Sequence, residues 1–223
     1  MSIIKDLRHA LFYRLLTNPK KGLVLLGDEC SWTILPDPIT AKSIVLSAGA
    51  GHDISFEKAL SERFGCRILL LDPSPTGRMT WQKFGADLPT TEFLPSALSD
   101  HDGWISLGDP LDAEEGSFRS ASLHPASTLK VPSRSIKAIC AERSWERIDL
   151  LKMDIEGAEY DVVESLLADG ISIGQICVEF HHGAGFSTSR SDTIRTILML
   201  RKAGYRLVHR IHWDHTFVHR TLL

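Results

Sequence analysis

The sequence predicts an α/β fold organised around a doubly wound, mostly parallel β-sheet. Short apolar runs alternate with segments in which apolar residues recur at helical spacing, a pattern typical of successive βαβ units. The two apolar runs nearest the C-terminus are instead separated by a brief turn, so they must pair in antiparallel fashion. The sheet is therefore expected to be parallel along most of its width and to end in an antiparallel hairpin.

The first βαβ unit is expected between residues 43 and 72. An apolar run over residues 43–48 ends at a glycine, and a second run, CRILLLD, ends at Asp72. The segment between them carries one apolar stripe at helical spacing, formed by Phe56, Ala59, Leu60 and Phe64. Because the second run lacks polar alternation, it is expected to be a parallel strand covered by helices on both faces of the sheet.

The later elements repeat this pattern. The runs IDLLKMD (148–154) and QICVEF (175–180) are expected to be strands, each followed by a helix that ends at a glycine. The segments YRLVHRI and HTFVHR are expected to form the terminal hairpin around the turn HWDH. Residues 100–147 show the least regular pattern, and SDHDGWISLGD suggests an additional hairpin there.

The length of 223 residues suits one sizeable α/β domain with a single core. We expect an N-terminal helix and entry segment over residues 1–42 and the main domain over residues 43–223. The opening MSIIKDLRHALFYRLL has helical apolar spacing, but it is too short and too charged to span a bilayer, and it lacks a signal-peptide cleavage site. No integral membrane association is expected. The helix should pack on the domain, with a membrane-surface role or pairing in a homodimer as alternatives.

Charge and cysteine content exclude several classes of protein. A net charge of −3 gives no reason to expect a nucleic-acid backbone or an anionic membrane as the main partner. The four cysteines are widely spaced and form no CxxC motif, which favours structural thiols in a reducing cytoplasm. A cytoplasmic protein with no nucleic-acid partner is therefore expected.

A glycine loop, SAGAGHDI, connects the first strand to the first helix. Gly49 and Gly51 would let the backbone approach a ligand, but Ile54 stands where a dinucleotide fingerprint requires a third small residue. Its absence argues for a ligand without a pyrophosphate, such as S-adenosylmethionine (SAM), although a simple strand-to-helix turn is the alternative. Asp72, 23 residues after Gly49 (72 − 49), could accept both ribose hydroxyls, or it could cap the turn DPSP. The acid excludes a 2′-phosphate but does not separate NAD from SAM.

A resemblance to a known family strengthens the case for SAM. The stretch LLKMDIEGAEYDVVESLL resembles the K-x-D-x-E-G-x-E signature of the FkbM-type SAM-dependent methyltransferases. Further similar stretches are GDECSWTILPD, SAGAGHDISFEKALSERFGC, LDPSP, PSALSDHDGWISL and ICVEFHH, so the likeness runs from Gly27 to the C-terminus. It implies a seven-stranded methyltransferase (Rossmann-like) sheet, with O-methylation of a hydroxyl on a small molecule or sugar. The chain departs from the family at Ser47 and Ala48, where many members carry an acid.

The glycine loop, the ends of the following strands and this resemblance together indicate which residues bind the cofactor. Leu98 is included by analogy with the family, as a residue that flanks the adenine. The expected cofactor-binding residues are Ser47, Ala48, Gly49, Gly51, Asp53, Asp72, Pro73, Leu98 and Asp154.

The expected catalytic residues follow the fourth and fifth strands. The carboxyl ends of parallel strands open into one crevice, so Asp154, Glu179 and His181 should converge there. Strand alternation puts Glu179 and His181 on the same side, where the acid could orient the imidazole. We expect His181 to be the general base, with Asp154 or Glu179 orienting the acceptor hydroxyl. No metal is expected, although Asp154, Glu179 and a histidine could serve as ligands, and the histidines could instead cap the sheet.

Two other classes of function remain open. An NAD-linked oxidoreductase would use the same ribose-binding acid, but the missing third glycine and the terminal hairpin count against it. A catalytically silent methyltransferase-fold binding module is the second alternative, because the loop lacks an acid at Ser47.

Overall fold

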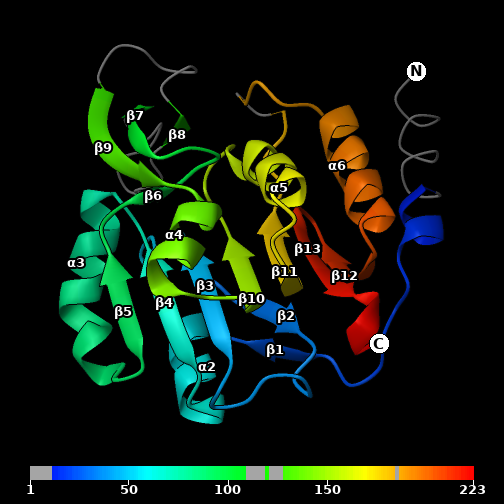
Figure 1. Ribbon diagram of the computed structural model, residues 1–223, viewed down its shortest axis with the longest axis horizontal. Coiled ribbons are helices and arrows are strands. Elements are labelled where there is room, and N and C mark those ends of the chain that lie inside the picture. The colour runs from blue at the N-terminus through cyan, green and yellow to red at the C-terminus, as the bar shows by residue number, and fades with distance from the viewer. Residues whose placement is uncertain (1–11, 109–118, 121–127, 184–185) are drawn as a thin grey trace.

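A central seven-stranded sheet forms the framework of the protein (Figure 1). The computed structural model describes residues 12–108, 119–120, 128–183 and 186–223. The strands of the sheet are β3 (Ile44–Ala48), β4 (Arg67–Leu71), β5 (Thr91–Leu94), β10 (Ile148–Met153), β11 (Ile173–Glu179), β12 (Tyr205–Ile211) and β13 (Asp214–His219). Their order is β12-β13-β11-β10-β3-β4-β5.

The pairing confirms the predicted mixed sheet. Strands β5, β4, β3, β10 and β11 run parallel to one another, whereas β13 lies antiparallel between β11 and β12. The chain winds outward from β3 to β5, returns to β10 and then winds in the opposite direction. This doubly wound order, closed by an antiparallel hairpin, is the fold that the sequence predicts.

Helices cover both faces of the sheet. One core cluster joins α4 (Ile136–Arg143), α5 (Glu159–Ala168) and α6 (Arg190–Lys202) to the sheet. A second cluster lies on the other face, where α2 (Ser55–Phe64) packs with the short hairpin of β1 (Val24–Leu26) and β2 (Trp32–Ile34). Successive side chains of a strand point to opposite faces of the sheet, so in β10 Leu151 belongs to the first cluster and Leu150 to the second.

The described part of the N-terminal segment packs on the same core. Residues 12–16 are helical, and Tyr13 and Leu16 are buried in the first cluster. The rest of the predicted N-terminal helix lies outside the described residues. The β1–β2 hairpin is fixed to the sheet by the Gln175 side chain, which bonds the backbone of Leu35 in both directions at 2.9 Å.

A second, four-stranded sheet contains the additional hairpin expected in residues 100–147. It comprises β6 (Ala97–Leu98), β7 (Gly103–Gly108), β8 (Arg119–Ser120) and β9 (Thr128–Arg134), in the order β6-β9-β7-β8. Strands β7 and β9 are antiparallel. In Figure 1 this sheet lies beyond the carboxyl ends of β4 and β5, above α3 (Pro75–Phe84).

Two short 3₁₀ helices, η1 (Gly85–Asp87) and η2 (Arg220–Leu222), complete the described elements. Across the described ranges of the chain, no helix combines the length and apolar character needed to cross a membrane.

Candidate active site

A cavity of about 560 Å³ opens at the carboxyl ends of the parallel strands. The glycine loop and the end of β4 form one wall, and the segment that follows β10 forms the opposite wall. Residues of β6 and β7 and the segment 186–188 complete the lining. Of the predicted cofactor-binding residues, those in the lining are Gly49, Gly51, Asp72, Pro73, Leu98 and Asp154.

The glycine loop adopts a conformation that only glycine suits at its first position. Gly49 has a φ of 91°, and a Cβ there would lie 2.0 Å from the carbonyl oxygen of Asp154. Its amide donates to the carbonyl of Leu71 at 2.9 Å. The loop is therefore clamped between the ends of β4 and β10, which brings its backbone to the floor of the cavity.

Asp72 supports this loop directly. Its Oδ2 accepts hydrogen bonds from the amides of Ala50 at 2.8 Å and Gly51 at 3.0 Å, and its Oδ1 accepts from the amide of Ser74 at 2.7 Å. Its side chain also faces α3, where a Cβ at Gly77 would lie 2.2 Å from the Asp72 carboxyl carbon. Asp72 thus lines the cavity while fixing the loop, and its contact with a ribose stays a prediction.

Three of the expected cofactor residues do not line the cavity. Ser47 and Ala48 are fully buried within β3, because the strand continues through them before the loop begins. Asp53 folds back and accepts hydrogen bonds from the amides of Cys30 and Ser55, each at 2.8 Å. These three residues lie behind the cavity wall, and their contact with the cofactor stays a prediction.

Two buried residues of opposite charge type, Lys152 and Glu57, lie beneath the loop. The Lys152 ammonium donates to the carbonyl oxygen of Gly49 and lies 5.6 Å from the centre of the Trp32 ring. Glu57 of α2 is also buried and accepts a hydrogen bond from the Ser47 hydroxyl. Burial raises the pKa of Glu57, and the positive charge of Lys152 opposes that rise. The acid missing from the loop is thus replaced by one that reaches Ser47 from the helix.

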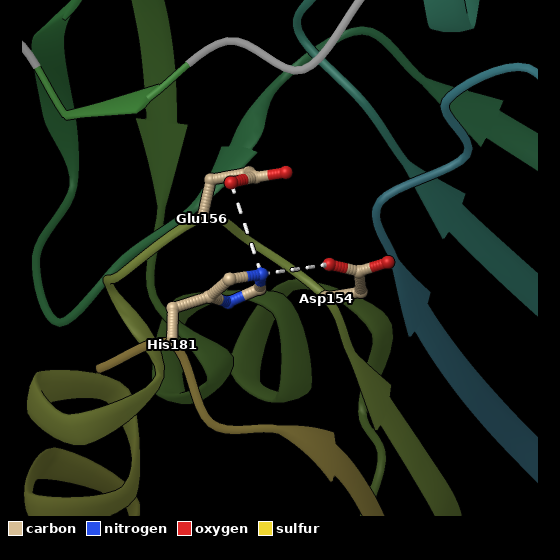
Figure 2. A group of neighbouring side chains, drawn as sticks. All are labelled: Asp154, Glu156 and His181. Carbon is tan, nitrogen blue, oxygen red and sulfur yellow. Dashed lines mark ion pairs between the residues drawn. The ribbon is translucent and has the colours of Figure 1, made fainter. Parts of the chain in front are cut away.

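His181 is surrounded by carboxylates, of which Asp154 and Glu156 line the opposite wall of the cavity, whereas His181 itself and Glu179 do not line it. The His181 Nε2 lies 3.8 Å from an oxygen of each of Asp154, Glu156 and Glu179. Figure 2 shows the imidazole pointing between the Asp154 and Glu156 side chains. The predicted convergence of Asp154, Glu179 and His181 at one edge of the sheet is therefore present in the structure.

The acid that orients His181 is Glu159, contrary to the expectation that Glu179 does so. The His181 Nδ1 and the Glu159 Oε1 are 2.8 Å apart, and the Glu159 side chain is completely buried. Glu159 stands in the first turn of α5 and accepts hydrogen bonds from the amides of Ile155 at 3.1 Å and Gly157 at 3.1 Å. Glu179 ends β11 two residues before His181, and its carboxylate approaches the other ring nitrogen, Nε2.

The pKa values of three side chains in and beside this cluster are raised, and the main cause differs between the histidine and the two acids. Burial alone would lower the pKa of His181, but the hydrogen bond and charge of Glu159, helped by Asp154 and Glu156, raise it to about 10. Burial raises the pKa of Glu179 above its ordinary value, and the charge of Asp154 adds to the rise. Burial likewise raises the pKa of Asp214 to about 6, with a further contribution from Asp154.

His215 of the terminal hairpin packs among core aromatic rings. His215 is buried, with its ring centre 5.1 Å from that of Phe180 and 6.2 Å from that of Phe217. Within the described ranges, the group whose ligand atoms lie close enough to hold a metal ion comprises Asp154, Glu156 and His181.

Lys152 and Glu159 belong to the site, but neither of them is assigned a role there from the sequence. Lys152 carries a usable signal, because it is a lone cation inside the apolar run IDLLKMD and such residues are rarely buried without a partner. Glu159 carries no such signal in the sequence, because an acid in the first turn of a helix is commonly explained by the helix dipole.

A comparison with known protein families identifies the family of this chain. A family model described as the methyltransferase FkbM domain matches residues 20–207. The chain belongs to the FkbM methyltransferase family. The FkbM signature residues all lie at this site: Lys152 holds the glycine loop, Asp154 and Glu156 line the cavity, and Glu159 orients His181.

Curated relatives extend beyond this chain. It is 35% identical over 203 residues to the probable methyltransferase-like protein 24 of Rattus norvegicus, covering 85% of this chain and 48% of the relative. It is 28% identical over 144 residues to the 2-O-methyltransferase NoeI of Sinorhizobium fredii, covering 57% of each. The chain thus spans about half the length of the curated relatives that it matches.

Solved structures with related architecture are distant in sequence. The N-methyltransferase NodS of Bradyrhizobium japonicum aligns over 98% of this chain and 97% of its own length, with a TM-score of 0.45 and 12% identity. Fibrillarin of Methanococcus jannaschii aligns over 90% and 84%, with a TM-score of 0.46 and 10% identity. The methyltransferase fold of this FkbM protein is therefore supported by its own strand order and by the family match.

Proposed function

We propose that this FkbM protein transfers a methyl group from SAM to a hydroxyl group of a small molecule or sugar. One observation supports this most strongly: a single cavity joins a glycine loop and ribose-competent acid on one wall to the carboxylates of Asp154 and Glu156 on the other, and both of these lie 3.8 Å from His181. A donor and an acceptor could therefore meet beside Asp154, which belongs to both sides.

The donor side has suitable groups for SAM. The loop from Gly49 to Gly51 presents backbone to the cavity, and Leu98 offers an apolar surface to an adenine ring. A carboxylate has about four acceptor positions, and Asp72 uses three of them for backbone amides, which leaves about one for a ribose hydroxyl. When bound, SAM supplies an electrophilic methyl group on a sulfonium.

The acceptor side would orient a hydroxyl and remove its proton. Because the pKa of His181 is raised to about 10, its imidazole is protonated near neutral pH and is better suited to orienting carboxylates than to accepting a proton. Glu179, whose pKa is raised by burial, is better matched to proton transfer near neutral pH. We therefore assign proton removal to a carboxylate, Glu179 or Asp154, in place of His181.

The choice of oxygen as the acceptor atom has support from one relative. NoeI, which matches 57% of this chain, is described as a 2-O-methyltransferase. The cluster of carboxylates also favours a hydroxyl, which must lose a proton as the new bond forms, over an acceptor that is already a strong nucleophile.

A calorimetric titration with SAM, S-adenosylhomocysteine and NAD tests the cofactor. We expect both adenosyl ligands to bind and NAD not to bind. Leu98→Trp, which fills the cavity, should weaken adenosyl binding at least tenfold, whereas Leu198→Trp, the same change at an exposed position of α6, should have no effect. Binding of NAD alone would support an oxidoreductase, and no binding at all would support a silent binding module.

The acceptor is tested with SAM that carries a labelled methyl group and a panel of sugars and small alcohols. We expect label in a methyl ether that survives mild alkali, identified by its methyl carbon shift in NMR. Label recovered as a methyl ester or an N-methyl group would refute O-methylation of a hydroxyl.

A further inference from the structure

The atoms around His181 have the spacing of a metal coordination sphere. One ligand atom from each of Asp154, Glu156 and His181 lies within 4.8 Å of the others, and the distances from Nε2 to both carboxylates are 3.8 Å (Figure 2). Around a six-coordinate divalent cation, neighbouring ligands are about 3 Å apart and opposite ligands about 4–5 Å apart. Shifts of a few tenths of an ångström would therefore bring all three atoms to one ion.

His181 is oriented as a metal ligand would be. Its side chain is only 5% exposed, and its Nδ1 is held by the buried carboxylate of Glu159. A cation that displaces the Nε2 proton would leave an imidazole that donates from Nδ1 and offers its lone pair from Nε2, an atom with no hydrogen bond within the described part of the chain. A carboxylate that fixes the far nitrogen of a histidine is the usual second shell of a metal-bound imidazole.

The backbone bends to bring Glu156 to the same place. Glu156 has a φ of 55°, in the left-handed region that non-glycine residues rarely adopt. The following residue, Gly157, has a φ of 108°, and its amide is held by Glu159. Strained residues of this kind persist where the surrounding structure enforces them, and they gather at functional sites. Glu159 thus positions both His181 and the turn that carries Glu156.

The charge of the site also favours a cation. Asp154 and Glu156 from the segment after β10 and Glu179 from the end of β11 approach one nitrogen, and Glu159 lies on its other side. The mutual repulsion of these acidic groups is strong in a site that is mostly shielded from water. A divalent ion between the carboxylates would remove most of that repulsion.

We propose that Asp154, Glu156 and His181 Nε2 bind a divalent cation, with Glu179 as a neighbouring fourth carboxylate. Two or three carboxylates with one imidazole fit Mn²⁺ best, because Mg²⁺ prefers oxygen ligands alone and structural Zn²⁺ prefers nitrogen and sulfur. Asp154 and Glu156 line the cavity, so the open positions of the ion face the space assigned to the acceptor. This role rests on the proposed function: the cation would hold the acceptor hydroxyl and increase its acidity.

Titration of the chelator-treated full chain with Mn²⁺ tests the site, with free Mn²⁺ measured by electron paramagnetic resonance. No SAM or acceptor is present. We expect one site per chain. Glu156→Gln should weaken Mn²⁺ binding at least tenfold, and Glu159→Gln, which loosens His181 and the turn that carries Glu156, should weaken it about tenfold. Glu164→Gln, the same change at an exposed position of α5, should bind Mn²⁺ as the wild type does.

Two results would overturn the proposal: no binding of Mn²⁺, Zn²⁺ or Mg²⁺ at millimolar concentration, or equal binding by Glu156→Gln and the wild type. A site that binds Zn²⁺ or Mg²⁺ but not Mn²⁺ would overturn the choice of metal. Titration of the same samples with SAM separates this proposal from the proposed function. Mn²⁺ binding without SAM binding would leave the cation site standing alone, and SAM binding without binding of any of the three cations would refute only the cation site.

Discussion

At the scale of single residues, the two loop glycines differ in what they tolerate. We predict that Gly49→Ala destabilises the protein by at least about 2 kcal/mol, because the new Cβ would lie 2.0 Å from the carbonyl oxygen of Asp154. Gly51→Ala should cost about 1–2 kcal/mol, because its φ of 51° is strained for alanine but its Cβ would meet nothing within 4 Å. Urea unfolding of both variants measures the difference, and equal losses would contradict the clamped loop.

Cys30 provides a chemical probe of the cavity wall. Its side chain is exposed, yet desolvation by the surrounding protein raises its pKa to about 11, and nearby carboxylates such as Asp154 add to the rise against the opposing charge of Lys152. At pH 7.5 we expect a thiol-disulfide reagent to react about tenfold more slowly than with free cysteine, because the smaller fraction of thiolate is partly offset by its greater nucleophilicity, and the rate to rise with pH up to about 11. Comparison with Cys30→Ser assigns the reaction. A rate equal to that of free cysteine would show that the wall is more open to water.

The candidate site shows which residue-level features sequence can predict. The rule that parallel strands end at one edge predicts that Asp154, Glu179 and His181 meet, and they do. The contact between Glu159 and His181 could not be predicted, because it joins a helix to a strand end 22 residues apart and depends on how α5 packs. For the same reason, the use of the Asp72 oxygens by loop amides depends on a turn geometry that the motif alone does not specify.

At the scale of elements, the buried charges beneath the loop couple β10 to α2. Lys152→Met removes the cation and leaves the buried Glu57 with less compensation, so we predict a loss of about 3 kcal/mol. Adding Glu57→Gln should recover part of that loss, because the remaining buried charge is removed as well. Urea unfolding of the two single variants and the double variant forms a thermodynamic cycle. Additive losses would show that the two charges act independently.

Helix α6 begins with a hydrogen-bonded cap, and this cap should make the stability of the protein depend on pH. The Asp192 carboxylate accepts from the amide and hydroxyl of Ser189, at 2.8 and 2.6 Å, and these bonds lower the pKa of Asp192. A lowered pKa stabilises the fold above the ordinary pKa of the group, and this contribution is lost as the pH falls through the lowered value. We expect Asp192→Asn to cost about 1 kcal/mol at pH 7 and progressively less below about pH 4. A cost independent of pH would contradict this origin.

The helices and strands that can be predicted from this sequence are those whose apolar residues recur with the period of a helix or form a continuous apolar run. The strands of the central sheet with apolar runs, such as β4 and β10, and the helices α2, α5 and α6 are visible in the sequence. The pattern does not reveal α3, which buries Thr76, Gly77 and Thr80 in place of an apolar stripe and relies on the Ser74 cap. Helix α4 is also missed, because it is short and its buried residues are only Ile136 and Ile139.

At the scale of the whole molecule, the two halves of the sheet share one core. Cys66 at the start of β4 and Cys177 in the middle of β11 are both fully buried, and they belong to the same cluster of apolar side chains. A domain of this size with a shared core is expected to unfold in one cooperative step. The two thiols should therefore become accessible together, although they lie in different halves of the sheet.

Because unfolding is expected to be cooperative, a ligand bound in the cavity should protect both buried thiols equally. If the proposed cofactor site is correct, S-adenosylhomocysteine at 100 times its Kd should add about 2.7 kcal/mol to the free energy of unfolding, as expected of a ligand that binds the folded chain and not the unfolded one. Thiol labelling in moderate urea should then slow by about a hundredfold at Cys66 and by the same factor at Cys177, as measured by mass spectrometry of the labelled peptides. Cys177 lies outside the cavity lining, so equal protection can reach it only through global unfolding. Protection of Cys66 alone would show that the half containing β4 opens independently of β11.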